Sequence, residues 1–470
     1  MSVPVAVART FERMREKEKG LELKRISRGY YVYRAVGVWD KEKKKSVKQT
    51  VYLGSIDADG VFHPKRLRPI PEKDKEVYEY GNAMLALNLL EDCRKQLGGY
   101  RHLDEIMAMS VLKAVDPCPL RLMQSKWAKL YPSTFLQADL RPSYLSRVLR
   151  EMGGNLSRWY DLYSSLVPNG DLLLYDLTSI ISYSENVKLA ARGYNKDHVY
   201  KDQVGVVMAF STTNMLPVGV DVFSGSIRDV STIRDFLARL KRNDIGFILD
   251  TGFTGEPLLR ELRREKIGYV VPLKRNSKEY DHPVFDTFFE YRDRGVQAAK
   301  KPLGEDYLYI YRDPLLRGEE ESTLIKRLEK KSITMETFNE TAERAGIIML
   351  RSSFDIEPEK VYDLYKGRED VEQVFDMLKN TLESDKTYMH SQEALKGYMI
   401  ITFLATRIHY KILKRLKEEG VSKKISVEEA LFELSKLEVI REKTGAEYHP
   451  KIPKKTREIE DLFPEIHSMG

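Results

Sequence analysis

Cysteine is scarce in this sequence, and its scarcity excludes several kinds of site. The 470 residues include two cysteines, Cys93 and Cys118, which are too few for a disulfide framework or a cysteine-rich zinc site. The eight histidines are scattered and show neither an HxxxH nor a His-x-Glu spacing. The sequence therefore argues against a metal held by cysteine or histidine.

Long hydrophobic runs are missing as well. Near the C-terminus the longest is YMIITFLAT, nine residues at 398–406, whereas a helix needs about 20 apolar residues to cross a bilayer. The start of the sequence turns highly charged at once, unlike a secretory signal peptide. We therefore expect a soluble, cytoplasmic protein with no membrane partner.

Charge is plentiful but nearly balanced. Charged residues make up 32% of the chain and apolar residues 42%, and the net charge is +7. The apolar fraction is enough for a sizeable core, and the small positive excess weakly favours an anionic partner such as nucleic acid. At roughly 150 residues per domain, the length suggests about three domains.

Changes in composition and hydrophobic periodicity along the chain predict six segments. In the first, two β-like runs flank a lysine-rich tip at 41–45, which is either a solvated turn or a DNA-backbone contact. In the second, helical periodicity includes a helix at 141–152 that is either a recognition helix or a surface helix. The predicted segments are a β-rich N-terminal unit (1–80), a helical DNA-binding region (81–168), the first part of an α/β core (169–275), a mostly β insertion (276–345), the second part of the core (346–420) and a helical and basic tail (421–470).

Two aspartates stand out in the first part of the core, whose pattern is β-β-β-α-β-α-β. Asp176 lies within the apolar run LLLYDLTS, and Asp250 ends the run FILDTGF. Each has an ordinary explanation, a strand aspartate bonded to backbone or Thr178 in one case and an Asx turn before Gly252 in the other. If the fourth strand lies beside the first, however, the two carboxylates face each other and need a cation such as Mg²⁺.

A third acid lies in the stretch YKGREDVEQVFDMLK. At 100° per residue, Tyr365, Arg368, Glu372 and Lys379 fall within an arc of roughly 60° on one helix. The ordinary explanation is an Arg368–Glu372 pair four residues apart, with a lysine two turns on. The alternative is that Glu372 completes a metal site while the cations hold phosphates on either side.

These residues resemble a known family, the DDE transposases of bacterial and archaeal insertion sequences with a Tyr-x2-Arg-x3-Glu-x6-Lys signature. Tyr365, Arg368, Glu372 and Lys379 match that spacing at every step. Asp176 in YDLTS and Asp250 in LDTGF resemble the family's first two acids, although Thr251 stands where arginine is common. FSGSIRD, with Gly225 and Asp229, and the N-terminal hairpin are also similar to family members.

The resemblance implies an RNase H-like mixed sheet with flanking helices and an insertion. It implies that Asp176, Asp250 and Glu372 are catalytic and hold two Mg²⁺ ions, with Mn²⁺ an alternative, and that Tyr365, Arg368 and Lys379 bind DNA. The expected activity is cleavage of the ends of an insertion sequence, followed by joining of the 3′-OH to target DNA. The expected partners are double-stranded DNA, as terminal inverted repeats and target, and a second copy in a DNA-bound homodimer associated with the nucleoid.

Three other functions remain open at this stage. A metal nuclease of RNase H type would cut without joining, and a domesticated relative would bind DNA without catalysis. A two-carboxylate glycosidase ranks far lower, because such an enzyme needs an aromatic sugar cleft beside its acids. The three tryptophans, Trp39, Trp127 and Trp159, all precede the segment that holds the acids.

Overall fold

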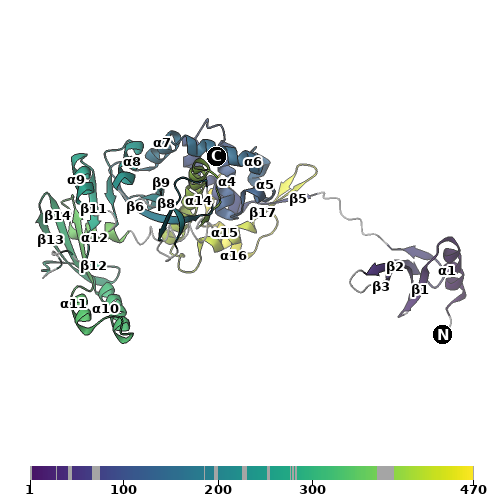
Figure 1. Cartoon of the computed structure of the whole chain (residues 1–470). Helices are drawn as coiled ribbons and strands as arrows, with labels where there is room; N and C mark the ends of the chain where they lie inside the picture. Colours follow the sequence, from purple (N-terminus) through teal and green to yellow (C-terminus); the bar gives the residue numbers. More distant parts are fainter. Residues whose placement is uncertain are drawn as a thin grey trace. The chain divides into compact units, whose positions relative to one another are not determined.

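The structure is a computed structural model, and it divides the chain into two compact units. It describes residues 3–27, 29–40, 45–65, 75–184, 186–194, 200–224, 230–250, 255–275, 277, 280, 283–367 and 386–468. The first unit comprises Met1–Glu76 with Glu442–Gly445, and the second comprises Val77–Arg441 with Ala446–Gly470. Figure 1 shows the helices and strands of both units.

The first unit is a helix on a four-stranded antiparallel sheet. Its elements are α1 (Val5–Lys17), β1 (Leu21–Ile26), β2 (Gly29–Asp40), β3 (Lys45–Ile56) and β4 (Phe62–Pro64), and the strand order is β1-β2-β3-β4. The predicted β2–β3 hairpin is confirmed, and the lysine-rich tip lies mostly outside the described residues. Side chains from the helix and three strands form a small core of Val7, Leu21, Tyr30, Val32 and Ile56.

The second unit begins with a group of helices that share one core with its sheet. These are α2 (Gly81–Asn88), α3 (Glu91–Gln96), α4 (Leu103–Val115), α5 (Leu120–Trp127), α6 (Pro142–Gly154) and α7 (Ser157–Leu166), with a 3₁₀ turn at Tyr131–Thr134. The long helix α14 (Gln392–Glu418) packs against both α4 and α6. The buried cluster runs without a break from these helices into the sheet, so the helical region is part of the same folded body.

Eleven strands form the mixed sheet of the second unit. They are β6 (Leu172–Ser182), β7 (Ala191–Tyr194), β8 (Tyr200–Ser211), β9 (Leu216–Ser224), β10 (Gly246–Ile248), β11 (Gly268–Pro272), β12 (Thr287–Tyr291), β13 (Arg294–Leu303), β14 (Asp306–Arg312), β15 (Ile347–Ser352) and β16 (Lys386–Thr387). The order is β12-β13-β14-β15-β11-β10-β6-β8-β7, with β9 paired to β8 and β16 to β6. Strand β10 is parallel to β6 and β11, whereas β8 is antiparallel to β6. The predicted mixed α/β class is therefore confirmed.

The helices that connect these strands follow their sequence signals closely. They are α8 (Val230–Leu240), α9 (Glu256–Arg264) and α12 (Pro358–Lys366). On α9 the buried residues Leu258, Leu259 and Leu262 lie on one side, as the three- and four-residue steps require. None of the helices in the described ranges is long and apolar enough to cross a membrane.

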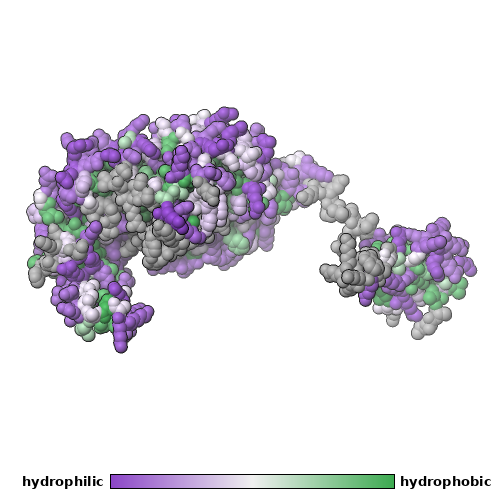
Figure 2. Space-filling view, viewed as in Figure 1, coloured by the Kyte–Doolittle hydropathy of each residue, from purple (hydrophilic) through white to green (hydrophobic). Residues whose placement is uncertain are grey.

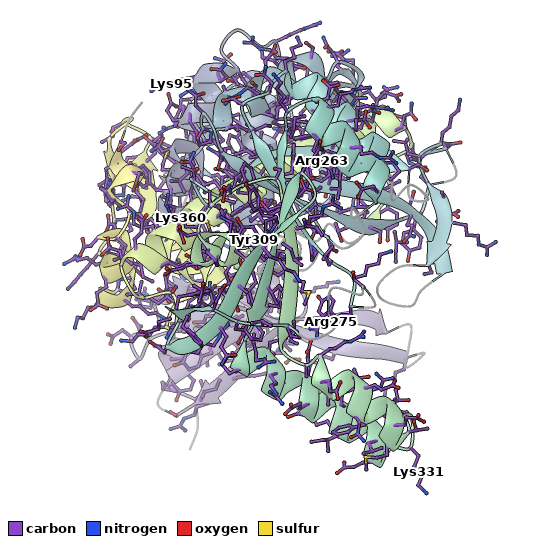
Figure 3. All side chains as sticks on the ribbon, turned by 90° about the vertical axis from the view of Figure 1, so that its left-hand side faces the viewer. Lys95, Arg263, Arg275, Tyr309, Lys331 and Lys360 are labelled. Atoms are coloured by element: carbon purple, nitrogen blue, oxygen red, sulfur yellow. The ribbon has the colours of Figure 1, made fainter. Side chains whose placement is uncertain are left out.

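The segment 276–345 differs from the expected mostly β insertion. Its strands β12 to β14 extend the main sheet, and they are followed by a helical hairpin of α10 (Pro314–Glu329) and α11 (Met335–Glu343). Asp313 is the N-cap of α10, and its side chain accepts hydrogen bonds from the N–H groups of Leu315 and Leu316. The hairpin extends away from the sheet, with Lys331 at its far end (Figure 3).

The C-terminal part also departs from one prediction. The helix expected over 426–440 ends early, because α15 spans Val427–Ser435 and β17 (Glu438–Glu442) follows it. The carbonyl of Leu437 accepts hydrogen bonds from the N–H groups of Tyr80 and Gly81, which draws this stretch out of helix. The remaining elements are β5 (Lys75–Glu79), β18 (Glu447–Tyr448), α16 (Lys454–Glu460) and a 3₁₀ turn at Pro464–His467. Hydrophilic side chains dominate the face of each unit seen in Figure 2.

Candidate active site

Asp176 lies on β6, and Asp250 follows the end of β10, the parallel neighbour of β6. The paired residues are Gly246 with Leu172, Phe247 with Leu173 and Ile248 with Leu174. Asp250 and Asp176 each come two residues after the last of these pairs. The N–H of Leu249 donates to the carbonyl of Val270 on β11 at 3.0 Å, so the strand geometry extends as far as that residue. Paired residues on neighbouring strands lie about 4.8 Å apart and point to the same face.

The surroundings of the two carboxylates are mostly apolar. Asp176 is 8% exposed, and the residue paired with it on β8 is the buried Met208. One carboxylate oxygen of Asp176 accepts the N–H of Leu177 at 2.8 Å. Asp250 is half-buried at the end of its strand. Two carboxylates placed close together in such a low-dielectric setting would repel each other, and a cation between them would remove the repulsion.

The described residues on either side of Glu372, Gly367 and Lys386, both lie near β6. Arg368, Glu372 and Lys379 lie outside the described residues, which stop at Gly367 and resume at Lys386. A methyl group built on Gly367 would lie 3.7 Å from Leu174 Cδ1, and Lys386 pairs with Ile181. Both ends therefore contact β6, one before Asp176 and one after it.

Comparison with known proteins gives the family. The family model for the transposase DDE domain matches residues 170–408, just over half of the chain. This chain belongs to the DDE transposase family.

The transposase also has a remote likeness among solved structures. A piggyBac transposase, determined by cryo-EM in a synaptic complex with hairpin DNA, is 13% identical with a TM-score of 0.41. The match covers 82% of this chain and 80% of that chain. No curated protein sequence matches the transposase.

The acids of the transposase suit a hard divalent cation. Asp176 and Asp250 offer carboxylate oxygens, the donors that Mg²⁺ and Mn²⁺ prefer. Among the described residues no group of three His, Cys, Asp or Glu side chains is placed to hold a metal ion, and Glu372 lies outside them. The two aspartates fit the divalent metal that the family implies, and a third carboxylate, from Glu372, would complete the donor set.

Tyr365 is the one member of the signature that the structure describes. It lies on the last turn of α12, is half-buried, and packs against the main core of the transposase. Tyr365 comes two residues before Gly367, the last described residue ahead of Glu372.

Two further buried acids in this sheet were not singled out from the sequence. Asp171 accepts hydrogen bonds from Ser211 and from Thr213 Oγ1, the latter at 2.8 Å. Asp221, within the apolar run LPVGVDVFS, is bonded by Tyr160 and Arg239. An acid inside an apolar strand is the same signal that drew attention to Asp176, so the sequence offered it at Asp221 too.

Proposed function

We propose that the transposase cleaves the ends of an insertion sequence and joins the freed 3′-OH to target DNA, with Asp176, Asp250 and Glu372 as its catalytic acids. The observation that carries this proposal is the parallel pairing of β6 with β10. Continued for two residues, the same register would bring Asp176 and Asp250 together on one face of the sheet. Gly367 and Lys386, the described residues on either side of Glu372, lie near Leu174 and Ile181 of β6, and this supports Glu372 as the third acid. The proposal includes an RNase H-like arrangement and membership of the Tyr-Arg-Glu-Lys signature group.

The three carboxylates would hold two Mg²⁺ ions, and Mn²⁺ would suit the same oxygen donors. When bound, such ions supply positive charge for the attacking and leaving oxygens of an in-line displacement at phosphorus. The chain itself needs no covalent nucleophile. Water would attack at the element end, and the freed 3′-OH would attack the target strand.

Tyr365, Arg368 and Lys379 would hold phosphates of the element end and fix the scissile bond in line. This is a positioning task, in which fixed positive groups and a hydroxyl orient an anionic strand. The first unit and the helices within 81–168 would recognise the terminal inverted repeats. Two copies would act together on two paired ends.

The decisive test is cleavage of a labelled duplex carrying the element's end, in the presence of Mg²⁺. Glu372→Gln keeps the side-chain shape and removes the charge. The matched control is Glu418→Gln, at an exposed position at the end of α14. We expect wild type and control to nick the 3′ end of the element, and Glu372→Gln to bind the duplex without cutting it.

The other outcomes separate the competing functions. Equal cutting by all three proteins would make Glu372 a structural residue. Nicking without joining, when a target plasmid is added, would indicate a metal nuclease. Specific binding with no cutting by wild type would indicate a DNA-binding protein without catalysis.

A further inference from the structure

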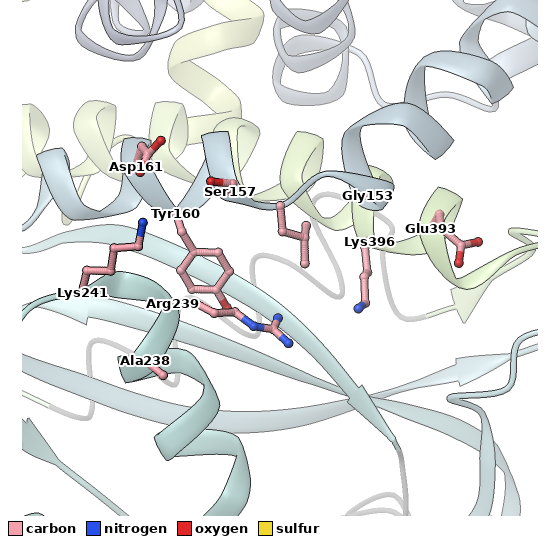
Figure 4. Close-up of a pocket in the computed structure, with 11 residues that line it drawn as sticks. Gly153, Ser157, Tyr160, Asp161, Ala238, Arg239, Lys241, Glu393 and Lys396 are labelled. Atoms are coloured by element: carbon pink, nitrogen blue, oxygen red, sulfur yellow. The ribbon is translucent and has the colours of Figure 1, made fainter.

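A second site lies away from the acids, in a pocket at the β9 edge of the sheet. It is enclosed by the junction of α6 and α7, the end of α8 and the start of α14, and its volume is about 590 Å³. Three cations line it, Arg239, Lys241 and Lys396, together with the acids Asp161 and Glu393. Figure 4 shows the Arg239 guanidinium and the Lys396 ammonium pointing into the same space, whereas Lys241 extends toward Asp161.

Arg239 is fixed in place by a buried acid beneath the pocket. Its Nη1 donates to Asp221 Oδ2 at 3.1 Å, and the hydroxyl of Tyr160 donates to the same oxygen. The guanidinium carbon lies 5.7 Å from the centre of the Tyr160 ring. The side chain of Asp221 is 3% exposed and that of Arg239 is 42% exposed. One edge of the guanidinium is therefore bonded inward, and its other N–H groups face the pocket.

Burying a carboxylate under an arginine is costly in free energy and brings little net stability. What it does provide is orientation, because a guanidinium held at one edge presents its remaining donors in a fixed plane. Such a plane matches the oxygens of a phosphate group. The Asp221–Tyr160–Arg239 arrangement therefore has the form of a preset anion-binding group.

Lys396 adds a second charge from another helix. No ion pair within the described parts of the chain is recorded for it, and Glu393, one turn earlier on α14, is its nearest acid along that helix. Gly154 lines the same pocket, and a methyl group built on it would meet no atom within 4 Å. The pocket wall therefore has free space beside Gly154.

The pocket lies close to the level of the acids along the sheet, on the opposite face. Asp221 pairs with Val207 on β8, which in turn pairs with Leu177 on β6, the residue after Asp176. Two strand spacings are about 10 Å. Because consecutive residues of a strand point to opposite faces, Asp221 points away from the face of Asp176.

We propose that this pocket binds a backbone phosphate of the DNA on which the transposase acts, through Arg239 and Lys396. This proposal rests on the proposed function in one respect, namely that DNA is the ligand. The bound phosphate lies to the side of the scissile one, where a strand passes the β9 edge. Its role is to anchor that strand.

The test measures duplex affinity with the full-length protein, not cleavage. Lys396→Gln removes one cation, and Gly154→Glu adds an opposing carboxylate without a backbone clash. Lys454→Gln is the matched control, since the side chain of Lys454 is 91% exposed on α16. The probe is a fluorescent 30-base-pair duplex of arbitrary sequence, titrated at several salt concentrations. Thermal melts confirm that each variant is folded.

We expect Lys396→Gln and Gly154→Glu to bind the duplex several-fold more weakly than the control. Each lost phosphate contact lowers the slope of log affinity against log salt by about 0.9. Unchanged affinity and slope in both folded variants would overturn the proposal. So would stabilisation of wild type by inorganic phosphate, lost in Lys396→Gln, with no change in duplex binding, because the pocket would then be a small-anion site.

The readout also separates this proposal from the catalytic one. If Glu372→Gln cuts normally while the pocket variants lose affinity, the catalytic assignment fails and the pocket stands. If the pocket variants bind normally while Glu372→Gln is inactive, the phosphate-binding proposal fails and the catalytic assignment stands. Arg239→Gln is not used for the decision, because it would leave Asp221 buried without its cation.

Discussion

A buried carboxylate must be compensated, and three in or next to the large sheet have different surroundings. Asp171, just before β6, accepts hydrogen bonds from hydroxyl groups, and Asp221 is bonded by a tyrosine and an arginine. Asp176 lies within β6 and accepts the N–H of Leu177, and the parallel neighbour β10 leads to Asp250. In the proposed function a cation between these two aspartates would stabilise both carboxylates.

At this scale the first prediction concerns Asp250→Asn. The substitution keeps the shape of the side chain and removes one negative charge from the pair, so it should lower the rate of Mg²⁺-dependent nicking by at least about a hundredfold. Duplex affinity should change little. Single-turnover nicking measures the first quantity and fluorescence titration the second.

Asp293→Asn is the matched control for that experiment. Asp293 is exposed and has a φ of 65° in the turn between β12 and β13, a conformation that asparagine tolerates well. The control should nick like wild type. Nicking by Asp250→Asn at the control's rate would contradict the assignment of Asp250 as a catalytic acid.

A second prediction concerns the pH dependence of stability at Asp92. This carboxylate of α3 binds Arg407 Nη2 at 2.8 Å and Lys411 Nζ at 2.9 Å on α14. Burial acts against its ionisation, but the charges of Arg407 and Lys411 outweigh burial and lower the pKa of Asp92 to about 2 from its ordinary 3.8. Because the folded-state pKa is lowered, the stabilisation is full above about pH 4 and is lost as the pH falls towards 2.

Asp92→Asn should therefore destabilise the fold near neutral pH by about 2–3 kcal/mol, since it leaves the buried Arg407 without its acid. The difference in Tm between wild type and variant should stay constant from pH 7 to 5 and narrow below about pH 4. Thermal melts across that range measure it. A difference that does not narrow on acidification would show that Asp92 contributes through packing and not through charge.

At the scale of the elements, α6 and α14 cross so closely that only glycine fits at the crossing, at Gly153 and Gly397. A methyl group built on Gly153 would lie 2.8 Å from the backbone nitrogen of Gly397 and would clash with the carbonyl oxygen of Glu393. One built on Gly397 would clash with the carbonyl of Leu149. The two backbones touch there, and the contact sets the position of Lys396 beside the pocket.

The third prediction follows from that contact. Gly153→Ala should destabilise the protein by about 1–3 kcal/mol, because an added carbon in a closed contact forces the helices apart. Gly154→Ala, one residue on, is the control. Its methyl group meets open space, so the change should be neutral or slightly stabilising. The Tm of each variant is compared with that of wild type. Equal Tm values for Gly153→Ala and Gly154→Ala would contradict a close contact between the two helices.

Elements with a clear period were predictable from the sequence, and short or context-dependent ones were not. The β10–β6 pairing, α8 and α9 follow from apolar runs and caps. The strand β17 was missed because LEVI continues the apolar pattern of α15, and what makes it a strand is its pairing with β18 and β5. The pocket could not be predicted from the sequence, because the residues that form it come from four elements: Tyr160, Asp221, Arg239 and Lys396. The catalytic role of Glu372 stays a prediction from the Tyr-Arg-Glu-Lys spacing, because Glu372 lies outside the described residues.

For the whole molecule, the two units have separate cores, and the second holds every predicted catalytic residue. The fourth prediction is that a protein beginning at Lys75 keeps the fold of the second unit, because the cluster around Val7 and Val32 is distinct from the main one. Its Tm should lie within a few degrees of the corresponding transition of the full chain. Affinity for the element's terminal repeat should fall if the first unit contributes to recognition.

Removing residues 1–165 instead would not isolate DNA binding from catalysis. That deletion takes away α4 and α6, which cover α14, so loss of folding is expected. Circular dichroism and thermal melts of the two truncated proteins distinguish these outcomes. A well-folded protein after the larger deletion would contradict the single shared core.

The packing of α14 against α4 has a consequence for how the protein is made. The two helices are about 300 residues apart in the chain, and synthesis at 5–20 residues per second separates them by about 15–60 s. During that interval the ten consecutive buried residues of α4, Glu105–Ala114, lack one of the surfaces that bury them. The growing polypeptide thus exposes the apolar surface of α4 until the last sixth of the chain, which holds α14, emerges from the ribosome. We expect the supply of chaperones to govern how much active protein a cell obtains.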